Sequence, residues 1–453
     1  MDKKTCGGAW MMQEKITLKR SLTLYQVVLF GLAYMTPMIV FGTYGILAET
    51  TNGFVPTAYL FALVAMLFTA FSYGNMVKAF PVSGSAYTYT RKSIGPNIGF
   101  MIGWTVLLDY FFLPMVIWLI GGVYLNAAFP SVPSWIWIVL FIAITTVINL
   151  IGIKVTTNVN LIMMTFQLLI VAIFILLSII SLIQGTGTGT VFLINPFFSG
   201  DFDFSLVVAG AAIACYSFLG FDAVTTLSEE TIEPEKTLPK AIFLITLFGG
   251  LIFMISSYFL ALVYPDFSSI TNADSASYEI ALMVGGNLFS AVFLAGLIIA
   301  QFASGLSAQT SAARLLYAMG RDGVLPKIFG YISLKARTPA FNLIMIGIIG
   351  LLALVMDMTT STSFINFGAF VTFTFVNFSV IAHYFVRQKR RTGKDLIMYL
   401  LFPIIGALCN LGLFVSLDKN ALILGTIWVT IGFIYLVFLT KFFTRKPPEI
   451  ELE

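Results

Sequence analysis

Residues 31–45 read Gly31-Leu-Ala-Tyr-Met-Thr-Pro-Met-Ile-Val-Phe-Gly-Thr-Tyr-Gly45 and interrupt an apolar segment in mid-span. Pro37 removes one helical hydrogen bond and clashes with the preceding turn. A second apolar segment is interrupted at Cys215-Tyr-Ser-Phe-Leu-Gly-Phe-Asp222, which holds Gly220 and a carboxylate. Paired interruptions at matching positions of two inverted halves are typical of the substrate site of a secondary transporter.

The composition excludes a water-soluble globule. The chain has 453 residues, of which 58% are hydrophobic and only 10% charged, whereas soluble domains carry about 25% charged residues. Lipid is the solvent that suits such a surface. Cations form short clusters between apolar runs, so nucleic-acid binding is not expected. Three scattered cysteines and a single histidine predict no metal site, no disulfide framework and no cofactor.

Apolar runs of about 20 residues predict an all-α membrane protein with twelve transmembrane helices. We place these helices at 22–48, 55–80, 96–127, 134–153, 160–183, 205–228, 240–264, 284–318, 339–357, 361–386, 395–416 and 421–443. Helices one and six run in opposite senses and begin two five-helix sets. The sequence therefore predicts a 5+5 inverted repeat (22–183 and 205–386), separated by an extracellular loop (184–204) and followed by helices eleven and twelve (387–443).

Charge sets the predicted orientation. With the N-terminus inside, all of the 25 cations except Lys419 fall in cytoplasmic segments. The sequence thus predicts a multi-pass protein of the bacterial cytoplasmic (inner) membrane, with cytoplasmic tails at 1–21 and 444–453. The first twenty residues contain no apolar core, so no cleavable signal peptide is expected.

Two acids, Asp109 and Asp222, lie deep in the predicted spans. A carboxylate at mid-helix costs about 2.5–3.5 kcal/mol on insertion scales and usually marks a pathway or a counter-ion. No Lys or Arg lies at comparable depth. The predicted partner is therefore a proton, a metal cation or a cationic substrate, and the alternative is a protonated acid bonded to backbone carbonyls.

Aromatic residues flank both acids. Tyr110 follows Asp109, and Tyr216 and Phe218 stand near Asp222. A proline four residues after Tyr110 leaves the carbonyl of Tyr110 without its helical partner. Carboxylates and carbonyls accept hydrogen bonds from an ammonium group, and aromatic faces add cation–π attraction. For each ring the alternative is simple packing.

Four glutamates close the sixth span on its predicted cytoplasmic side. We treat Glu229 and Glu230 as a candidate inner gate. The predicted partners of the four glutamates are Lys236, Lys240 or basic residues of other inner loops, and the plain reading is a solvated loop or a salt bridge at the inner gate.

The chain resembles the amino acid–polyamine–organocation superfamily of secondary transporters, and within it the bacterial putrescine importers. The resemblance extends from about Leu18 to about Lys441. It rests on the segments Tyr25-Gln-Val-Val-Leu-Phe-Gly-Leu-Ala-Tyr-Met-Thr-Pro-Met38, Gly84-Ser-Ala-Tyr-Thr-Tyr89, Leu107-Leu-Asp-Tyr-Phe-Phe-Leu-Pro-Met115, Ser217-Phe-Leu-Gly-Phe-Asp-Ala-Val-Thr-Thr-Leu-Ser-Glu-Glu-Thr231, Leu315-Leu-Tyr-Ala-Met-Gly-Arg-Asp322 and Ile365-Asn-Phe-Gly-Ala-Phe370.

This resemblance implies two inverted five-helix repeats plus two helices, with the substrate between helices one, three, six, eight and ten. It also implies that an acid at Asp222 and aromatics at Tyr110 and Tyr216 bind the substrate. With the residues argued above, the predicted substrate-binding set is Asp222, Tyr110, Asp109, Tyr216, Phe218, Gly220, Phe41, Gly42 and Pro37.

The chain departs from the superfamily pattern at two places. The helix-one break is bulky and apolar, whereas amino-acid carriers have small residues there that take an α-carboxylate. Helix five reads Met164-Thr-Phe-Gln-Leu168 without the Lys of some ion-independent relatives, so the coupling ion stays open.

These observations predict a transporter and not an enzyme. We expect import of putrescine or a similar small diamine by alternating access, driven by proton symport or by the membrane potential. The bilayer and protons are the expected partners. An amino-acid permease and a putrescine/ornithine exchanger of the same fold stay open as alternatives, whereas the sequence has neither the catalytic constellation of a membrane enzyme nor the ring of pore-lining charges of a channel.

Overall fold

The computed structural model describes residues 20–448, apart from 83, 152, 201, 271–272, 274–275, 334–337 and 357. Most of the predicted N-terminal tail, 1–19, and the last part of the predicted C-terminal tail, 449–453, therefore lie outside the described residues. The described chain is helical, and its one isolated β-bridge joins Leu22 to Thr231. The all-α prediction is confirmed.

The helices follow one another along the chain as a bundle of mostly long apolar segments. They are α1 (Leu24–Met35), α2 (Ile39–Thr50), α3 (Val55–Ala79), α4 (Ser85–Ser93), α5 (Pro96–Ala128), α6 (Ser134–Ile151), α7 (Ile153–Ile183), α8 (Phe204–Ala214), η1 (Cys215–Phe218), η2 (Ala223–Leu227), α9 (Pro234–Val263), η3 (Phe267–Ser269), α10 (Ala276–Arg321), η5 (Lys327–Gly330), α11 (Ala340–Gly350), η6 (Leu351–Leu354), α12 (Met358–Val380), η7 (Ile381–Arg387), α13 (Gly393–Leu396), η8 (Ile397–Leu401), α14 (Phe402–Val415) and α15 (Lys419–Leu439).

Each of the twelve predicted apolar ranges falls on helix. Ten helices of the described chain are long and apolar enough to cross a membrane, or eleven if the bent pair α1–α2 is one span. The range predicted at 339–357 forms only the shorter apolar helix Ala340–Leu354, and about 20 residues are needed to cross the hydrocarbon core. The count of twelve full spans is therefore not confirmed.

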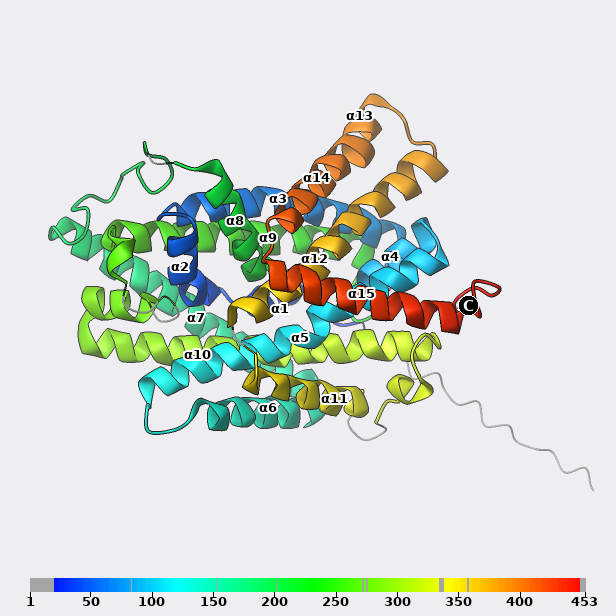
Figure 1. Ribbon diagram of the computed structural model, residues 1–453, viewed down its shortest axis with the longest axis horizontal. Coiled ribbons are helices and arrows are strands. Elements are labelled where there is room, and N and C mark those ends of the chain that lie inside the picture. Colours follow the sequence, from blue (N-terminus) through cyan, green and yellow to red (C-terminus); the bar gives the residue numbers. More distant parts are fainter. Residues whose placement is uncertain are drawn as a thin grey trace, which may run out of the picture.

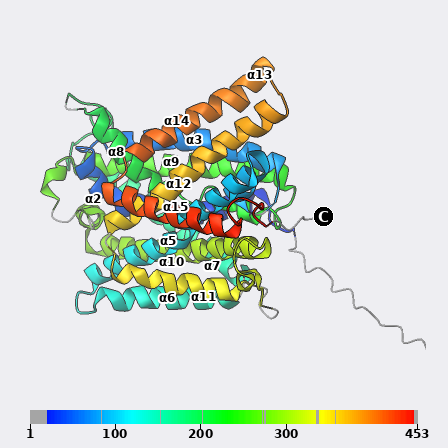
Figure 2. The same cartoon turned by 45° about the vertical axis from the view of Figure 1, so that its right-hand side comes forward.

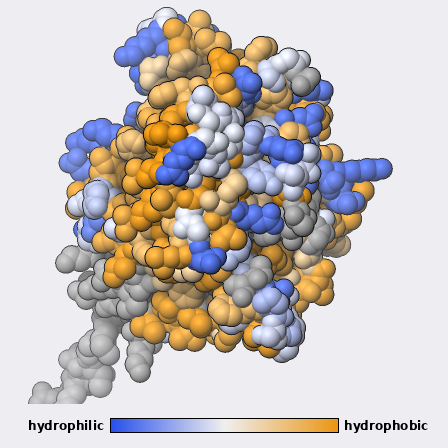
Figure 3. Space-filling model, turned by 90° about the vertical axis from the view of Figure 1, so that its left-hand side faces the viewer, coloured by the Kyte–Doolittle hydropathy of each residue, from blue (hydrophilic) through white to orange (hydrophobic). Residues whose placement is uncertain are grey.

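The long helices pack in layers. Helices α5 and α10 run side by side through the middle, and α6 and α11 lie together on one outer face in both views (Figures 1 and 2). The end of α12 and the start of the α13–α14 segment project from the body as a helical hairpin. Figure 3 shows the end of the molecule at the left of Figure 1, where hydrophilic patches are surrounded by hydrophobic residues.

Helix α4 is absent from the sequence prediction because a search for long apolar runs passes over its nine mostly polar residues, SAYTYTRKS. Arg91 on this helix donates to the Tyr87 hydroxyl at 2.7 Å. It also donates to the carbonyls of Pro447 and Pro448, at 3.2 and 2.8 Å. The segment that follows α15 therefore folds back against α4.

Helix α8 begins at a side-chain cap. The carboxylate of Asp203 accepts hydrogen bonds from the hydroxyl and the backbone N–H of Ser205, both at 2.8 Å. These bonds hold the pKa of this exposed carboxyl below its ordinary value. The cap satisfies a backbone donor that the first turn of a helix leaves free.

Candidate substrate-binding site

The two predicted helix breaks are present. Helix α1 ends at Met35 and α2 begins at Ile39, and the two helices are bent by 42° around Pro37. In the sixth predicted span, η1 ends at Phe218 and η2 begins at Ala223. Both interruptions thus fall where the proline and glycine pattern places them.

The two breaks lie against each other. Gly220 has a φ of +108°, a conformation that side chains other than glycine rarely adopt. A Cβ added at Gly220 would overlap the ring of Tyr34, near the end of α1. The serine hydroxyl of Ser304, on α10, donates to the Tyr34 carbonyl at 2.8 Å. Three elements therefore meet at the point where both helices lose their regular backbone.

Asp222 lies at this meeting point and is 1% exposed. Its Oδ2 accepts hydrogen bonds from the hydroxyls of Tyr73, at 3.2 Å, and Tyr110, at 3.3 Å. Its Oδ1 has no hydrogen-bond partner among the residues that the structure describes. Within the described ranges, Asp222 forms no ion pair with Lys, Arg or His. A buried carboxylate without a counter-charge is costly, so this position suits a cation.

Asp109 on α5 is also buried, at 2% exposure, and its Oδ1 has no partner. Tyr110, the next residue along α5, donates to the Asp222 carboxylate, so this part of α5 lies beside the sixth predicted span. Gly368 lets α12 approach α5 here, because a Cβ at this position would come within 2.8 Å of the Leu108 Cβ. The structure therefore brings together the two acids that the sequence singled out.

Tyr216 lies between two small cavities. One, of about 10 Å³, is lined by Tyr34, Thr36, Tyr216, Gln301 and Ser304 among others. The second, of about 20 Å³, is lined by Thr43, Ile213, Tyr216, Thr362 and others. Each has room for about one water molecule. Tyr216 thus lines both the cavity at the helix breaks and a second cavity formed by α2, α8 and α12.

The other predicted site residues have different surroundings. The Phe41 ring packs edge-on against Phe174 and Phe293, with centroids 4.9 Å apart in both pairs. Phe218 packs edge-on against Phe253 of α9. Gly42 and Pro37 are buried in and after the first break. Substrate contact by these four residues stays a prediction.

Two residues of the site were missed by sequence reasoning. The sequence placed Tyr216 and Phe218 beside Asp222, but Tyr73 and Tyr110 donate to its carboxylate. Tyr73 comes from α3, and no charge or break marks it in the sequence. Gln301 is uncharged and escaped a search for ionisable groups. The only signal in the sequence that could have indicated Tyr73 or Gln301 is a polar side chain within an otherwise apolar span.

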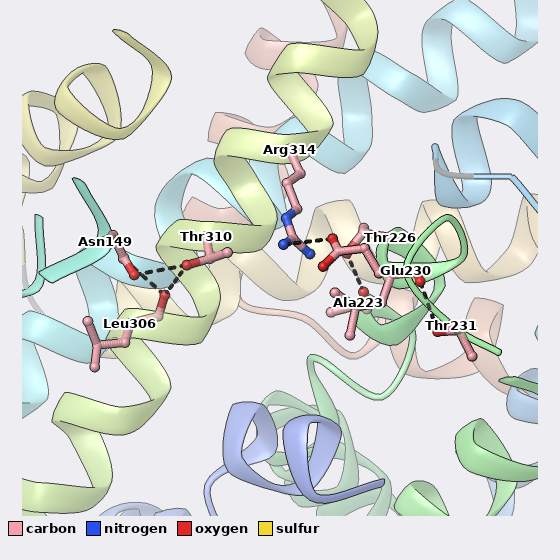
Figure 4. A network of polar contacts seen from close by, with 9 residues as sticks. Asn149, Ala223, Thr226, Glu230, Thr231, Leu306, Thr310 and Arg314 are labelled. Carbon is pink, nitrogen blue, oxygen red and sulfur yellow. Dashed lines mark hydrogen bonds and ion pairs between the residues drawn. The ribbon is translucent and has the colours of Figure 1, made fainter. Parts of the chain in front are cut away.

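The candidate inner gate contains one short ion pair. Arg314 of α10 lies 2.8 Å from Glu230, and Arg321 lies 4.0 Å from Glu229. Figure 4 shows Arg314 pointing toward Glu230 across the gap between α10 and the end of η2. Of the predicted alternatives, Lys236 pairs instead with the exposed Glu233. Glu230 therefore links the sixth predicted span to α10.

The start of α1 joins the same cluster. The backbone N–H groups of Ser21 and Leu22 donate to the Glu230 carbonyl, and the Ile232 N–H donates to the Leu22 carbonyl. The entry to the first broken helix and the exit from the second are thus hydrogen-bonded to each other beside Arg314.

Glu230→Gln is expected to lower the free energy of unfolding by roughly 1–3 kcal/mol, because Arg314 is left largely buried without its counter-charge. Thermal unfolding of the purified protein in detergent measures this. Glu233→Gln is the matched control: it breaks a pair with side chains 58–67% exposed, and such pairs contribute about 0–1 kcal/mol. Equal effects of both substitutions would show that the Glu230 pair does not hold the helices together.

In the part of the chain that the structure describes, no group of three His, Cys, Asp or Glu side chains is placed to hold a metal ion. The two described cysteines, Cys215 and Cys409, are free.

The family model for amino acid permeases matches residues 26–446. This chain belongs to the amino acid permease family. It is thus a member of the amino acid–polyamine–organocation superfamily, as its motifs predicted, and the family consists of transporters and not enzymes. The resemblance to this superfamily that the sequence motifs indicated is confirmed.

Curated relatives cover almost the whole permease chain. The low-affinity putrescine importer PlaP of Escherichia coli (strain K12) is 46% identical over 439 residues, which span 96% of this chain and 97% of PlaP. The branched-chain amino acid permease BcaP of Bacillus subtilis (strain 168) is 27% identical over 92% of this chain and 90% of its own length.

A solved structure shares the fold. It is the substrate-bound outward-open state of a Na⁺-coupled sialic acid symporter, with a TM-score of 0.55 over 89% of this chain and 90% of that one. At 13% identity the likeness concerns the fold alone. A multi-pass transporter fold with two interrupted helices is therefore established for the permease, in agreement with the sequence.

Proposed function

We propose that the chain imports putrescine or a similar small diamine across the membrane by alternating access. The observation that carries this proposal is Asp222, a buried carboxylate at the meeting of two broken helices. In the described part of the chain, one of its oxygens is unpaired and no cationic side chain forms an ion pair with it. An ammonium group supplies both the charge and the hydrogen bonds that this oxygen lacks. The 46% identity to a putrescine importer supports the same substrate class.

The helix-one break favours a substrate without a carboxylate. Free N–H groups at the start of α2 would favour a carboxylate. The Ile39 N–H donates to the Thr36 carbonyl at 2.9 Å, and the Phe41 N–H donates to the Met38 carbonyl at 3.1 Å. These two amides are thus already used within the break, which supports a diamine over an amino acid.

In the proposed binding mode, Asp222 takes one ammonium group, and the Tyr73 and Tyr110 hydroxyls hold its carboxylate in place. Asp109 supplies the second negative charge. The rings of Tyr110 and Tyr216 enclose the four-carbon chain, with Phe41 and Phe218 behind them. Pro37, Gly42 and Gly220 keep the backbone open where the substrate enters.

Alternating access then requires two barriers. In this proposal Tyr216 is the barrier on the outer side, and the fact that it lines both cavities supports this role. Glu229 and Glu230 form the inner gate with Arg321 and Arg314. Transport to the inside requires these ion pairs to separate while the broken helices α1–α2 and α8–η2 keep hold of the site.

The proposed architecture has twelve helices, ten of them in a 5+5 inverted repeat with the segment boundaries given above. The breaks at corresponding places in the first and sixth spans support this arrangement. We place the protein in the bacterial cytoplasmic membrane with both termini in the cytoplasm, because the basic residues gather in the segments that this orientation puts inside.

The membrane potential favours uptake of a dication by about 2.3 kcal/mol per charge per 100 mV. Import by potential alone, or together with proton symport, is therefore energetically reasonable. The two modes differ in their response to a pH gradient.

Uptake of radiolabelled putrescine into proteoliposomes with set pH and potential gradients tests the function. We expect uptake into empty vesicles, stimulated by an inside-negative potential, and weak competition by ornithine, because ornithine adds a carboxylate to the same skeleton. Ornithine competing at similar concentrations would favour the amino-acid permease. Flux that requires substrate on both sides would favour the exchanger.

A further inference from the structure

Gln301 on α10 is one of two glutamines of the described core that are fully buried with an unpaired amide, and of these two it alone lines the cavity at the helix breaks. It is 0% exposed, and neither its Oε1 nor its Nε2 has a hydrogen-bond partner. Buried amides are almost always hydrogen-bonded, because an unpaired amide loses its bonds to water without replacement. An amide left without any partner therefore needs a reason.

The surroundings of Gln301 indicate where a partner for its amide could bind. Gln301 lines the cavity at the helix breaks, together with Tyr34, Thr36 and Tyr216. By contrast Gln309, farther along α10 and also buried, donates to the Thr146 hydroxyl and to the Leu343 carbonyl and accepts from Asn149. A buried glutamine on this helix can therefore find partners in the core. Gln301 has none among the described residues, and it lines the cavity.

The cavity lies beside the acids. Leu113 and Ile117 of α5 line it, and they follow Asp109 by one and two helical turns. Leu219, three residues before Asp222, lines it from the sixth span. A molecule bound to the acids and extending along α5 would therefore bring its other end toward Gln301.

We infer that Gln301 is the acceptor for the ammonium group at the far end of the diamine from Asp222, and that it sets the preference for a diamine over a monoamine. This inference rests on the proposed function. An ammonium group carries three N–H donors, and the amide oxygen of Gln301 can accept a hydrogen bond from one of them. The amide is neutral, so it binds the second ammonium without adding another buried charge, and an unpaired second ammonium would be expelled.

Gln301→Met tests this role, since methionine has nearly the same length and no hydrogen-bonding amide. Binding of putrescine and of 1-aminobutane, which lacks the second amine, is measured on the purified full-length protein. We expect putrescine affinity to fall roughly ten- to hundred-fold, the range of a hydrogen bond to a charged group. Affinity for 1-aminobutane should stay within about two-fold, so the preference for the diamine is largely lost.

Thermal stability provides a second readout. Replacing an unpaired buried amide by an apolar group of similar shape is neutral or stabilising. The melting temperature of Gln301→Met should therefore equal or exceed that of the wild type. Gln301→Glu, of the same shape, keeps an acceptor at this position and should retain the diamine preference.

Gln167 on α7 is the matched control. It is likewise 0% exposed with both amide atoms unpaired, but it does not line this cavity. Gln167→Met should keep the diamine preference. An unchanged preference in Gln301→Met overturns the inference, since a single water molecule would then be the partner of the amide. Failure of the wild type to bind any diamine would instead overturn the proposed function.

Discussion

Asp222→Asn is expected to abolish putrescine binding. The amide keeps the shape of the side chain and can still accept from the Tyr73 and Tyr110 hydroxyls, so the local fold should persist. It cannot balance an ammonium group in a site that excludes water, where removing one member of a buried charge pair costs about 3–5 kcal/mol. Affinity should therefore fall by a factor of several hundred or more, as measured by binding of radiolabelled putrescine to the purified protein.

Two controls accompany this variant. Asp203→Asn removes one negative charge from an exposed position and keeps a residue that caps α8, so putrescine affinity should not change. The melting temperature of Asp222→Asn shows whether the variant is folded. A folded Asp222→Asn that binds putrescine as the wild type does would exclude the counter-ion role.

Gly220→Ala is expected to be the most damaging small substitution in the site. Alanine at a φ of +108° is strained, by about 1–3 kcal/mol. The added methyl group overlaps the Tyr34 ring, which adds about 1–3 kcal/mol of overpacking. The total of about 2–6 kcal/mol should appear as a lower melting temperature and a low yield of folded protein.

Gly412→Ala is the control for this substitution. Gly412 lies in α14, and a Cβ there meets no atom within 4 Å. Alanine favours a helix over glycine by up to about 1 kcal/mol, so this variant should be as stable as the wild type or more stable. A second substitution, Tyr34→Leu, should recover part of the stability lost in Gly220→Ala by removing the overlap. No recovery would mean that backbone strain alone accounts for the loss.

Much of the fold could be predicted from sequence because lipid leaves few choices. Long apolar runs must be helices in a bilayer, and Pro37 and Gly220 mark the breaks directly. Helix α4 could not be found this way, since its residues are polar and it is too short to cross a membrane. The segment 339–357 was predicted as a full span because it is largely apolar in composition, but its helix covers only Ala340–Leu354.

The candidate site was only partly predictable. Asp109 and Asp222 were identified because charge is rare at that depth. Tyr73 was not, since a tyrosine in an apolar helix gives no indication of the direction in which its hydroxyl points. The same limit applies to Phe41 and Phe218, which sequence spacing puts near the acids and which pack against Phe174, Phe293 and Phe253. Side-chain direction depends on how helices distant in the sequence pack together.

The backbone bonds between the start of α1 and the residues after η2 restrict how the molecule can move. Three hydrogen bonds tie Ser21 and Leu22 to Glu230 and Ile232. In kinematic terms, the start of α1 and the residues after η2 move together as one part, and not as two independent parts. A backbone displacement that takes Glu230 away from Arg314 must carry Leu22 with it or break the two bonds to the Glu230 carbonyl.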